Sequence, residues 1–295
     1  MRLLFVLSCC LLLAAPARAA EVVLSSSEDT PALRAFALAL AERRPQDQVS
    51  FRPLAQLGRV AGLPADCRLI LLDRQALDWR LSDPLGPPTL VLRVSRVEAQ
   101  RLLGNTRPGH LSLLWSDPPA ARQLALARLL LPGRTRIGVL YGTDSAFLLP
   151  ELARAAAPLG LQIVAQAWTD NRDSRPLLSL LARSDLLLGL DDAQLYNNRT
   201  IKNLLLSSYA QQRILLGPSA GFVRAGSLAS SYSDQDDWLA TLDQMLDQEP
   251  QDWPRELYPS RFKVQSNRQV ARALGIELAD DAELARRLAA GENTP

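Results

Sequence analysis

Short, almost continuously apolar runs alternate along the chain with longer segments that carry apolar residues at helical spacing. The runs that predict strands are 22–24, 49–51, 69–72, 90–94, 111–115, 137–141, 161–167, 185–190 and 213–216. Strands that are apolar throughout are typical of parallel sheets covered on both faces. Strand and helix patterns that alternate at this spacing therefore predict an α/β fold.

The longer segments predict the helices. A first helix opens at Pro31 with Thr30 as its N-cap, and the later ones are 97–103, 120–131, 145–157, 176–182, 196–211, 236–248, 267–274 and 282–290. After residue 226 the pattern changes to a polar extended run, a Pro-rich stretch at 249–259 and a short strand at 262–264. The pattern predicts two Rossmann-like lobes with parallel sheets, joined by a hinge near residues 116–119.

The N-terminus has the pattern of an export signal. Arg2 is followed by an apolar run to Ala15, and small residues precede an expected cut near Ala19 or Ala20. The alternatives are a lipoprotein cut at Cys9 and a buried N-terminal helix, and both are less favoured. The segment therefore predicts a periplasmic protein without a lipid anchor.

Charge and composition exclude several functions. Without residues 1–19 the chain has 31 basic and 31 acidic residues. A neutral protein is poorly suited to sequence-independent nucleic-acid binding, which requires the neutralisation of phosphates. His110 is the only histidine, and Cys67 is the only cysteine after residue 19, so the usual zinc ligand sets cannot form. We expect neither metal nor cofactor.

One catalytic motif needs to be tested. Gly217-Pro218-Ser219-Ala220-Gly221 matches the G-x-S-x-G motif of hydrolases. That motif requires a helix directly after the serine and a histidine further along the chain. We expect an extended run after Ser219, and no histidine follows His110. The sequence thus predicts a binding protein and not an enzyme.

A ligand of such a protein would lie at the carboxyl ends of the strands, where the crevice of an open parallel sheet is found. The candidate contacts are Ser25, Ser26, Ser27 and Ser116 in the first lobe, and Tyr141, Thr143, Asp144, Ser145, Trp168, Asp170, Asp191 and Ser219 in the second.

Each candidate also has a structural alternative. Tyr141 and Trp168 can stack on a flat ligand, but Trp168 can equally pack in the core. Asp144 or Asp191 can pair with an amine, whereas Asp144 can instead cap the helix near residue 145. Asp191 and Asp192 together are typical of a solvated turn. Residues 25–27 can be a plain loop.

Four segments of the second half carry a family resemblance. They are Arg136–Tyr141 after Leu129–Pro132, Arg213–Gly217, Ala225–Ser230, and Phe262–Asn267 with Ala271–Gly275. In order and spacing they resemble a family of ABC-transporter substrate-binding proteins with the type I periplasmic fold, over roughly residues 110–278. The first lobe resembles that family in its pattern only.

The resemblance implies how the chain is divided and what it does. One lobe would comprise residues 20–116 plus about 229–258, and the other residues 117–228 plus about 259–295. The expected function is the capture of a small molecule, amino-acid-like or aromatic in some members, by a monomer that delivers it to an inner-membrane ABC permease. A periplasmic sensor or accessory protein on the same fold, which regulates a membrane partner, is the alternative.

Overall fold

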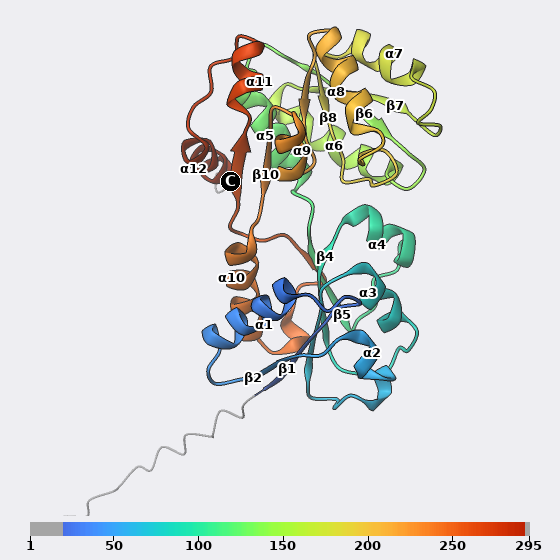
Figure 1. Ribbon diagram of the computed structural model, residues 1–295, viewed down its shortest axis with the longest axis vertical. Coiled ribbons are helices and arrows are strands. Elements are labelled where there is room, and N and C mark those ends of the chain that lie inside the picture. Colours follow the sequence, from blue (N-terminus) through green and yellow to red (C-terminus); the bar gives the residue numbers. More distant parts are fainter. Residues whose placement is uncertain (1–19, 293–295) are drawn as a thin grey trace, which may run out of the picture.

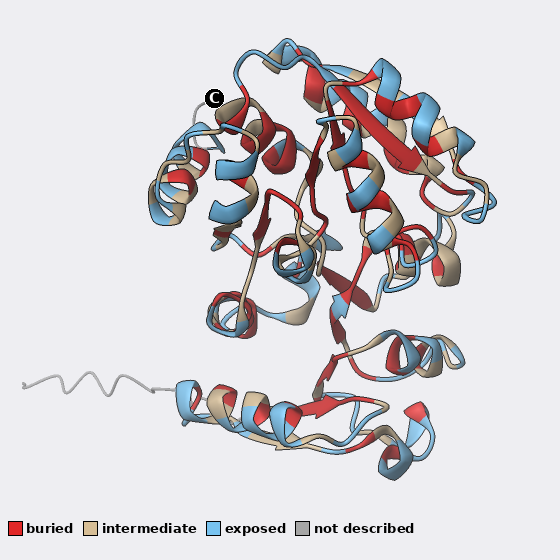
Figure 2. Cartoon of the chain, turned by 45° about the horizontal axis from the view of Figure 1, so that its top comes forward, coloured by how far each residue is buried: buried red, intermediate tan, exposed pale blue. Residues whose placement is uncertain are grey.

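Two parallel sheets, one in each of two lobes, organise the computed structural model, which describes residues 20–292 (Figure 1). The predicted α/β class is confirmed. The expected signal segment, residues 1–19, lies outside the described residues. In Figure 2 the buried residues follow the strands and the inner sides of the helices in both lobes.

The first lobe is built on six parallel strands in the order β11-β5-β4-β3-β1-β2. These strands are β1 (Glu21–Ser25), β2 (Gln48–Phe51), β3 (Arg68–Leu71), β4 (Thr89–Val94), β5 (Leu111–Trp115) and β11 (Glu256–Leu257). Its helices are α1 (Pro31–Arg43), α2 (Leu54–Leu57), α3 (Arg74–Leu81), α4 (Arg96–Leu103) and α10 (Gln235–Leu246). Helices α1 and α10 share one apolar cluster with the sheet, and α2, α3 and α4 share another.

The second lobe contains a four-stranded parallel sheet in the order β7-β6-β8-β9, with an antiparallel pair beside it. Its strands are β6 (Arg136–Tyr141), β7 (Gln162–Ala167), β8 (Leu186–Leu188), β9 (Ile214–Leu216), β10 (Ala229–Tyr232) and β12 (Lys263–Ser266). Its helices are α5 (Ala120–Leu130), α6 (Leu149–Ala156), α7 (Arg175–Arg183), α8 (Ile201–Ala210), α9 (Ala220–Ala225), α11 (Arg268–Ala273) and α12 (Asp281–Glu292).

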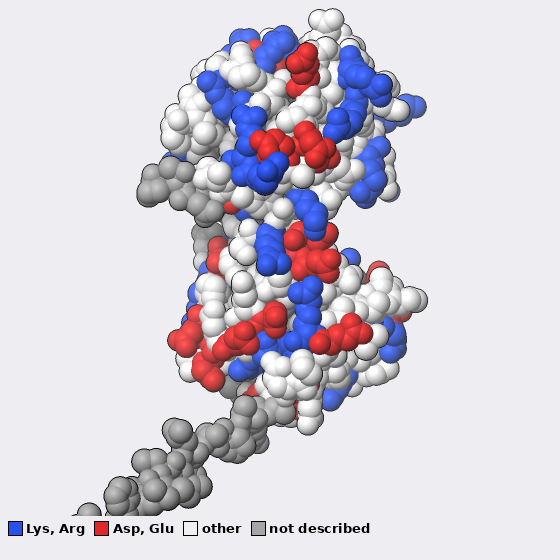
Figure 3. Space-filling model, turned by 90° about the vertical axis from the view of Figure 1, so that its left-hand side faces the viewer, with Lys and Arg blue, Asp and Glu red and all other residues white. Residues whose placement is uncertain are grey.

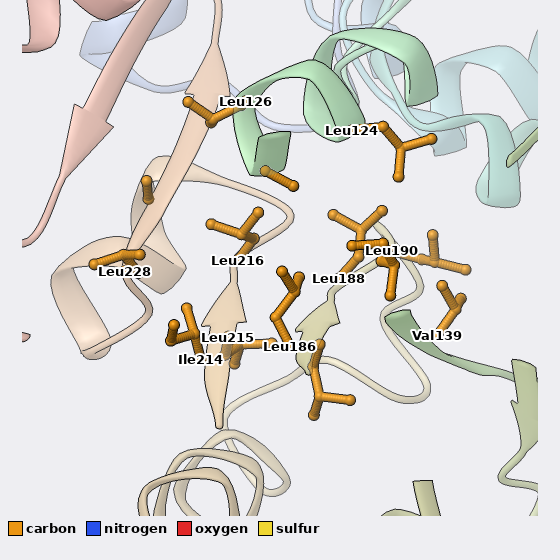
Figure 4. Packing of buried hydrophobic residues seen from close by; sticks show 14 of the residues in the cluster. Leu124, Leu126, Val139, Leu186, Leu188, Leu190, Ile214, Leu215, Leu216 and Leu228 are labelled. Carbon is orange, nitrogen blue, oxygen red and sulfur yellow. The ribbon is translucent and has the colours of Figure 1, made fainter. Parts of the chain in front are cut away.

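One large apolar cluster forms the core of the second lobe. Figure 4 shows leucines of β8 and β9 gathered beneath Leu124 of α5. Leu124, Leu186 and Leu216 are fully buried. Such side chains contribute roughly 1.5–3 kcal/mol each by leaving water, so the continuously apolar runs explain both the strands and the core.

Three segments join the lobes. The chain crosses between β5 and α5 at residues 116–119, between β10 and α10 at residues 233–234, and between β11 and β12 at residues 258–262. Strand β10 pairs with β12 in the second lobe and begins beside β9, where Leu228 N donates to Leu215 O over 2.8 Å. The expected return to the first lobe near residue 229 therefore falls inside a strand of the second lobe, and the crossing begins at Ser233.

Four elements differ from the sequence prediction. Helices α2 and α3 were not expected; the Asp73 carboxylate starts α3 by accepting from Ala76 N over 2.8 Å. Strand β11 lies within the Pro-rich stretch, where Leu113 N donates to Arg255 O. Helix α9 follows Ser219 directly, so the expected extended run after this serine is wrong. Residues 220–225 form a short helix, and Gly226 ends it with a φ of 130°.

Candidate functional site

The carboxyl ends of both parallel sheets meet at the junction of the two lobes. In the first lobe, β4 ends at Val94 and Ser95 then starts α4 through a capping box with Glu98. Ser95 Oγ accepts from Glu98 N over 3.2 Å, and Glu98 Oε2 accepts from Ser95 N over 3.0 Å. This reciprocal cap fixes the first turn of α4. It thereby places Arg96, the first residue of the helix, at the end of the sheet.

Helix α4 of the first lobe docks on the second lobe. Val97 is only 1% exposed and belongs to the apolar cluster of the second lobe. Four residues later, Arg101 lies on the same side of the helix. It donates to Asp144 over 2.5 Å and to the fully buried Asp192 over 3.4 Å. Ser95 Oγ also donates to Asp191 O over 3.4 Å.

Arg96 reaches across the same junction. Its guanidinium pairs with Glu151 of α6 at 2.7 Å and donates to the Tyr258 hydroxyl over 3.2 Å. Its Cζ lies 5.7 Å from the ring centroid of Phe147, within range of a cation–π contact. Burial opposes the charge of Arg96, but Tyr258 and Glu151 raise its pKa above the ordinary value. The charged form is therefore firmly held.

A small cavity of about 40 Å³ lies beside these contacts and is lined by both lobes. Its lining includes Arg96, Asp117, Leu148, Leu152 and Asp191. A single water occupies roughly 30 Å³ of liquid, and ordinary ligand pockets measure roughly 300–1,000 Å³. The junction is thus closed against a solute, and α4 and Arg96 fill the space.

Two carboxyl groups in this cavity have strongly raised pKa values. Burial raises the pKa of Asp117 to about 6, although the backbone N–H of Arg96 donates to it over 2.8 Å. Burial, with the nearby charges of Asp117, Glu98 and Asp192, raises the pKa of Asp191 to about 7. No described residue donates a hydrogen bond to the Asp191 carboxylate. Asp192 is fully buried, so the expected solvated turn is wrong at that residue, whereas Asp191 keeps some exposure.

The predicted serines of the first lobe lie at the end of β1. Ser25 is fully buried, and its Oγ has no partner among the described residues. Ser26 Oγ donates to Asp73 over 2.6 Å, and Ser27 donates to the same carboxylate through its backbone N over 2.7 Å. Burial opposes ionisation of Asp73, but these hydrogen bonds lower its pKa. Ser116 lies in the first crossover segment, and its N donates to Val94 O.

Arg93 is a first-lobe residue that the sequence did not single out. It interrupts β4 at an irregularity between Val91 and Val94, with φ of 58°, where few side chains other than glycine are found. It lines two neighbouring cavities of about 300 and 380 Å³ at the end of the sheet, and Ser26 and Ser27 line the larger one. A strand bulge of this kind redirects a side chain. No pattern in the sequence predicted this bulge.

The predicted residues after β6 separate from one another. Tyr141 is half-buried and packs against the second lobe's core. Thr143 lines a cavity of about 450 Å³ on the second lobe. Asp144 pairs with Arg101, and the expected capping role is absent because Ser145 occupies the N-cap position. Ser145 is itself buried, and its Oγ donates to Asp192 over 2.7 Å.

The remaining candidates lie on two different elements. Trp168 is 0% exposed, and its Nε1 donates to Asp173 O over 2.8 Å, so its ring packs in the core beneath the 450 Å³ cavity. Asp170 lines that cavity. Ser219 precedes α9 in an ordinary extended conformation, with φ −156° and ψ 165°, which is not the strained turn of a hydrolase nucleophile. The structure thus brings Asp144 and Asp191 to the junction of the lobes, with Ser116 in the crossover segment beside it.

Charge, hydropathy and metal-ligand spacing elsewhere add three observations. On the face shown in Figure 3, basic and acidic side chains are interspersed over both lobes. Within residues 20–292, no helix is both long and apolar enough to cross a membrane, and no three histidine, cysteine or acidic side chains are grouped as metal ligands.

Comparison with known proteins identifies the fold. No protein-family model and no curated protein matches the chain. An ABC domain from Streptococcus pneumoniae in complex with L-Trp has 16% identity and a TM-score of 0.59, over 90% of this chain and 98% of that one. A conserved domain protein from Vibrio cholerae has 18% identity and a TM-score of 0.61, over 90% and 98%.

A third solved structure extends the comparison. It is the ligand-free, open form of a substrate-binding protein with adhesive properties from Clostridium difficile, with 16% identity and a TM-score of 0.67 over 89% of this chain and 97% of that one. These likenesses span both lobes. The chain therefore has the type I periplasmic binding protein fold of ABC-transporter substrate-binding proteins, as its sequence resemblance predicted.

Proposed function

We propose that this protein is an exported, periplasmic solute-binding protein that captures a small molecule between its lobes and delivers it to an inner-membrane ABC permease. The observation that carries this proposal is the meeting of both parallel sheets, by their strand ends, at a junction joined by three crossover segments. Such a junction lets two rigid lobes close on a ligand by hinge motion. The protein would act as a monomer, without a cofactor and without chemistry.

A ligand of this protein would enter through the junction only after the lobes have moved apart. The cavity of about 40 Å³ is too small for a solute, so α4 must leave the second lobe before the junction can accept one. The contacts that must break are those of Val97, Arg101 and Arg96 described above. Cavities of about 380 and 450 Å³ on the facing lobe ends then supply space on either side.

The test is a thermal-unfolding screen of the purified protein, stripped of bound ligand by unfolding and refolding. The panel contains amino acids, nucleosides, sugars, vitamins, polyamines and guanidinium compounds. A ligand at about 100 times its Kd adds roughly 2.7 kcal/mol of stability. A melting-temperature rise with one chemical class supports the proposal. A flat panel, repeated with the Arg96→Ala variant, which lacks one of the contacts that hold the junction closed, contradicts it.

A second candidate is a periplasmic sensor or accessory protein on the same fold. The closed junction favours it, because α4 holds the lobes together through the chain's own side chains. Such a protein would regulate a membrane partner without taking up a ligand. Small-angle scattering distinguishes the two functions, because a solute-binding protein changes its radius of gyration when the identified ligand is added and this alternative does not.

A further inference from the structure

The side chain of Arg96 occupies a position that is already built to hold a cation. Glu151 pairs with its guanidinium, the ring of Phe147 lies beneath it, and Asp191 faces the same cavity. All three of these groups belong to the second lobe, whereas Arg96 belongs to the first. When the lobes separate, the cation leaves and its acceptors stay behind.

Carboxylates outnumber arginines at this junction. Glu151, Asp144 and Asp192 pair with Arg96 and Arg101. Three further carboxylates lie close by and belong to Glu98, Asp117 and Asp191. The Asp191 carboxylate is mostly buried, lines the cavity and accepts no hydrogen bond from residues 20–292. An ionised carboxylate with little solvent around it and no hydrogen-bond donor is unfavourable, so the junction still lacks positive charge even with Arg96 in place.

The surroundings fit an organic cation. An aromatic face attracts guanidinium and alkylammonium groups, and Leu148, the residue after Phe147, lines the cavity together with Leu152. A carboxylate on one side and an aromatic face on the other can bind the charged head of such a ligand. The two leucines can contact its alkyl stem.

We infer that the solute is an organic cation with a guanidinium or ammonium head that binds between Glu151, Phe147 and Asp191 in place of Arg96. This inference rests on the proposed function, because it assigns the substrate class of the same junction. It also makes Arg96 an internal competitor of the solute. The two cations cannot occupy one position, so the Arg96 side chain must withdraw before the solute binds.

The experiment uses paired probes that differ only in charge. Calorimetric binding is measured for methylguanidinium against methylurea, and for L-arginine against L-citrulline, with the purified protein at constant ionic strength. We expect the charged member of each pair to bind at least about tenfold more tightly, which corresponds to roughly 1.4 kcal/mol. Equal affinity within both pairs overturns the inference. Binding of magnesium chloride as tightly as the organic cations overturns it too.

Three variants locate the site. Arg96→Ala removes the competitor, and we expect tighter binding of methylguanidinium. Glu151→Gln keeps the shape of the side chain and removes its charge, and we expect binding to weaken at least about tenfold, since a hydrogen bond to a charged acceptor is stronger than one to a neutral acceptor. Asp280→Asn is the matched control, because Asp280 is 71% exposed and pairs only with Arg268 at the surface. Its affinity should equal that of the unmodified protein.

The outcomes separate the inference from the proposed function. If a neutral or anionic member of the screening panel binds and the cations do not, the solute-binding function stands and the cation inference fails. If no compound binds either the unmodified protein or Arg96→Ala, both fail. If Glu151→Gln folds, as judged by its unfolding curve, but binds methylguanidinium as tightly as before, the site assignment fails.

Discussion

Replacing Asp191 with asparagine tests the electrostatics of the closed junction. The pKa of Asp191 is about 7, against an ordinary value of 3.8. At about 1.4 kcal/mol per pKa unit, the ionised carboxylate opposes the closed, folded state by roughly 4 kcal/mol. If the junction opens while the lobes stay folded, part of this cost is relieved before the protein unfolds. Roughly 4 kcal/mol is therefore the upper limit for the change in the free energy of unfolding.

The sign follows from proton binding. A raised folded-state pKa means that the folded protein binds this proton more tightly than the unfolded chain does. The stability that it contributes is complete below about pH 4 and is lost as the pH rises to about 7. Asparagine stays neutral throughout. Asp191→Asn should therefore be more stable than the unmodified protein at about pH 8, and close to it at about pH 4.

Urea unfolding at a series of pH values provides the measurement, since the midpoint reports stability when the slope is unchanged. Asp191→Asn should reduce the fall in stability between about pH 4 and 7. A smaller fall should remain, because Asp117 has a pKa of about 6 and still loses its proton in this range. Asp280→Asn serves as the control and should follow the unmodified protein. If Asp191→Asn is no more stable at about pH 8, or its stability falls just as steeply, then Asp191 is not a buried, repelled carboxylate.

Three further predictions concern other contacts. Arg101→Ala should loosen the docking of α4 and leave the buried Asp192 with less compensation, at a cost of about 1 kcal/mol. The radius of gyration in scattering should then increase, and an unchanged radius contradicts this. Gly138→Ala should cost roughly 1–3 kcal/mol in urea unfolding, because its Cβ would lie 2.6 Å from Ser184 Oγ; unchanged stability contradicts the close packing. Arg93→Gly should raise the melting temperature by relieving a left-handed backbone, worth roughly 1 kcal/mol, and a lower value would show that its side chain is structural.

The sequence predicted the strands well because burial on both faces leaves a continuous apolar run. Helix α3 shows where this reasoning fails. Its sequence is strongly polar, and its buried Arg80 is fully enclosed, with Nε donating to Thr89 Oγ1 over 3.0 Å. A guanidinium that satisfies backbone carbonyls in the interior has the sequence appearance of an exposed residue. No periodicity of apolar residues can reveal it.

The site was predicted less well than the fold. Placing candidates at the ends of strands found Asp144 and Asp191, because strand ends share one edge of a parallel sheet. Arg96, Glu151 and Phe147 were missed, since they meet only when α4 of one lobe docks on α6 of the other. A capping-box pattern at Ser95 to Glu98 marks the start of that helix. Nothing local to Asp191 shows that a distant helix covers it.

The threefold crossing of the chain between lobes has a consequence for biosynthesis. The first lobe's core needs α10 and β11, which arrive roughly two hundred residues after β1 has been made, and the second lobe is finished only by β12 and the helices after it. Neither half can mature as an N-terminal unit while the remainder is still being synthesised. Contacts so distant in sequence form slowly. The two lobes of this topology can therefore become rigid only together, once most of the chain has been made.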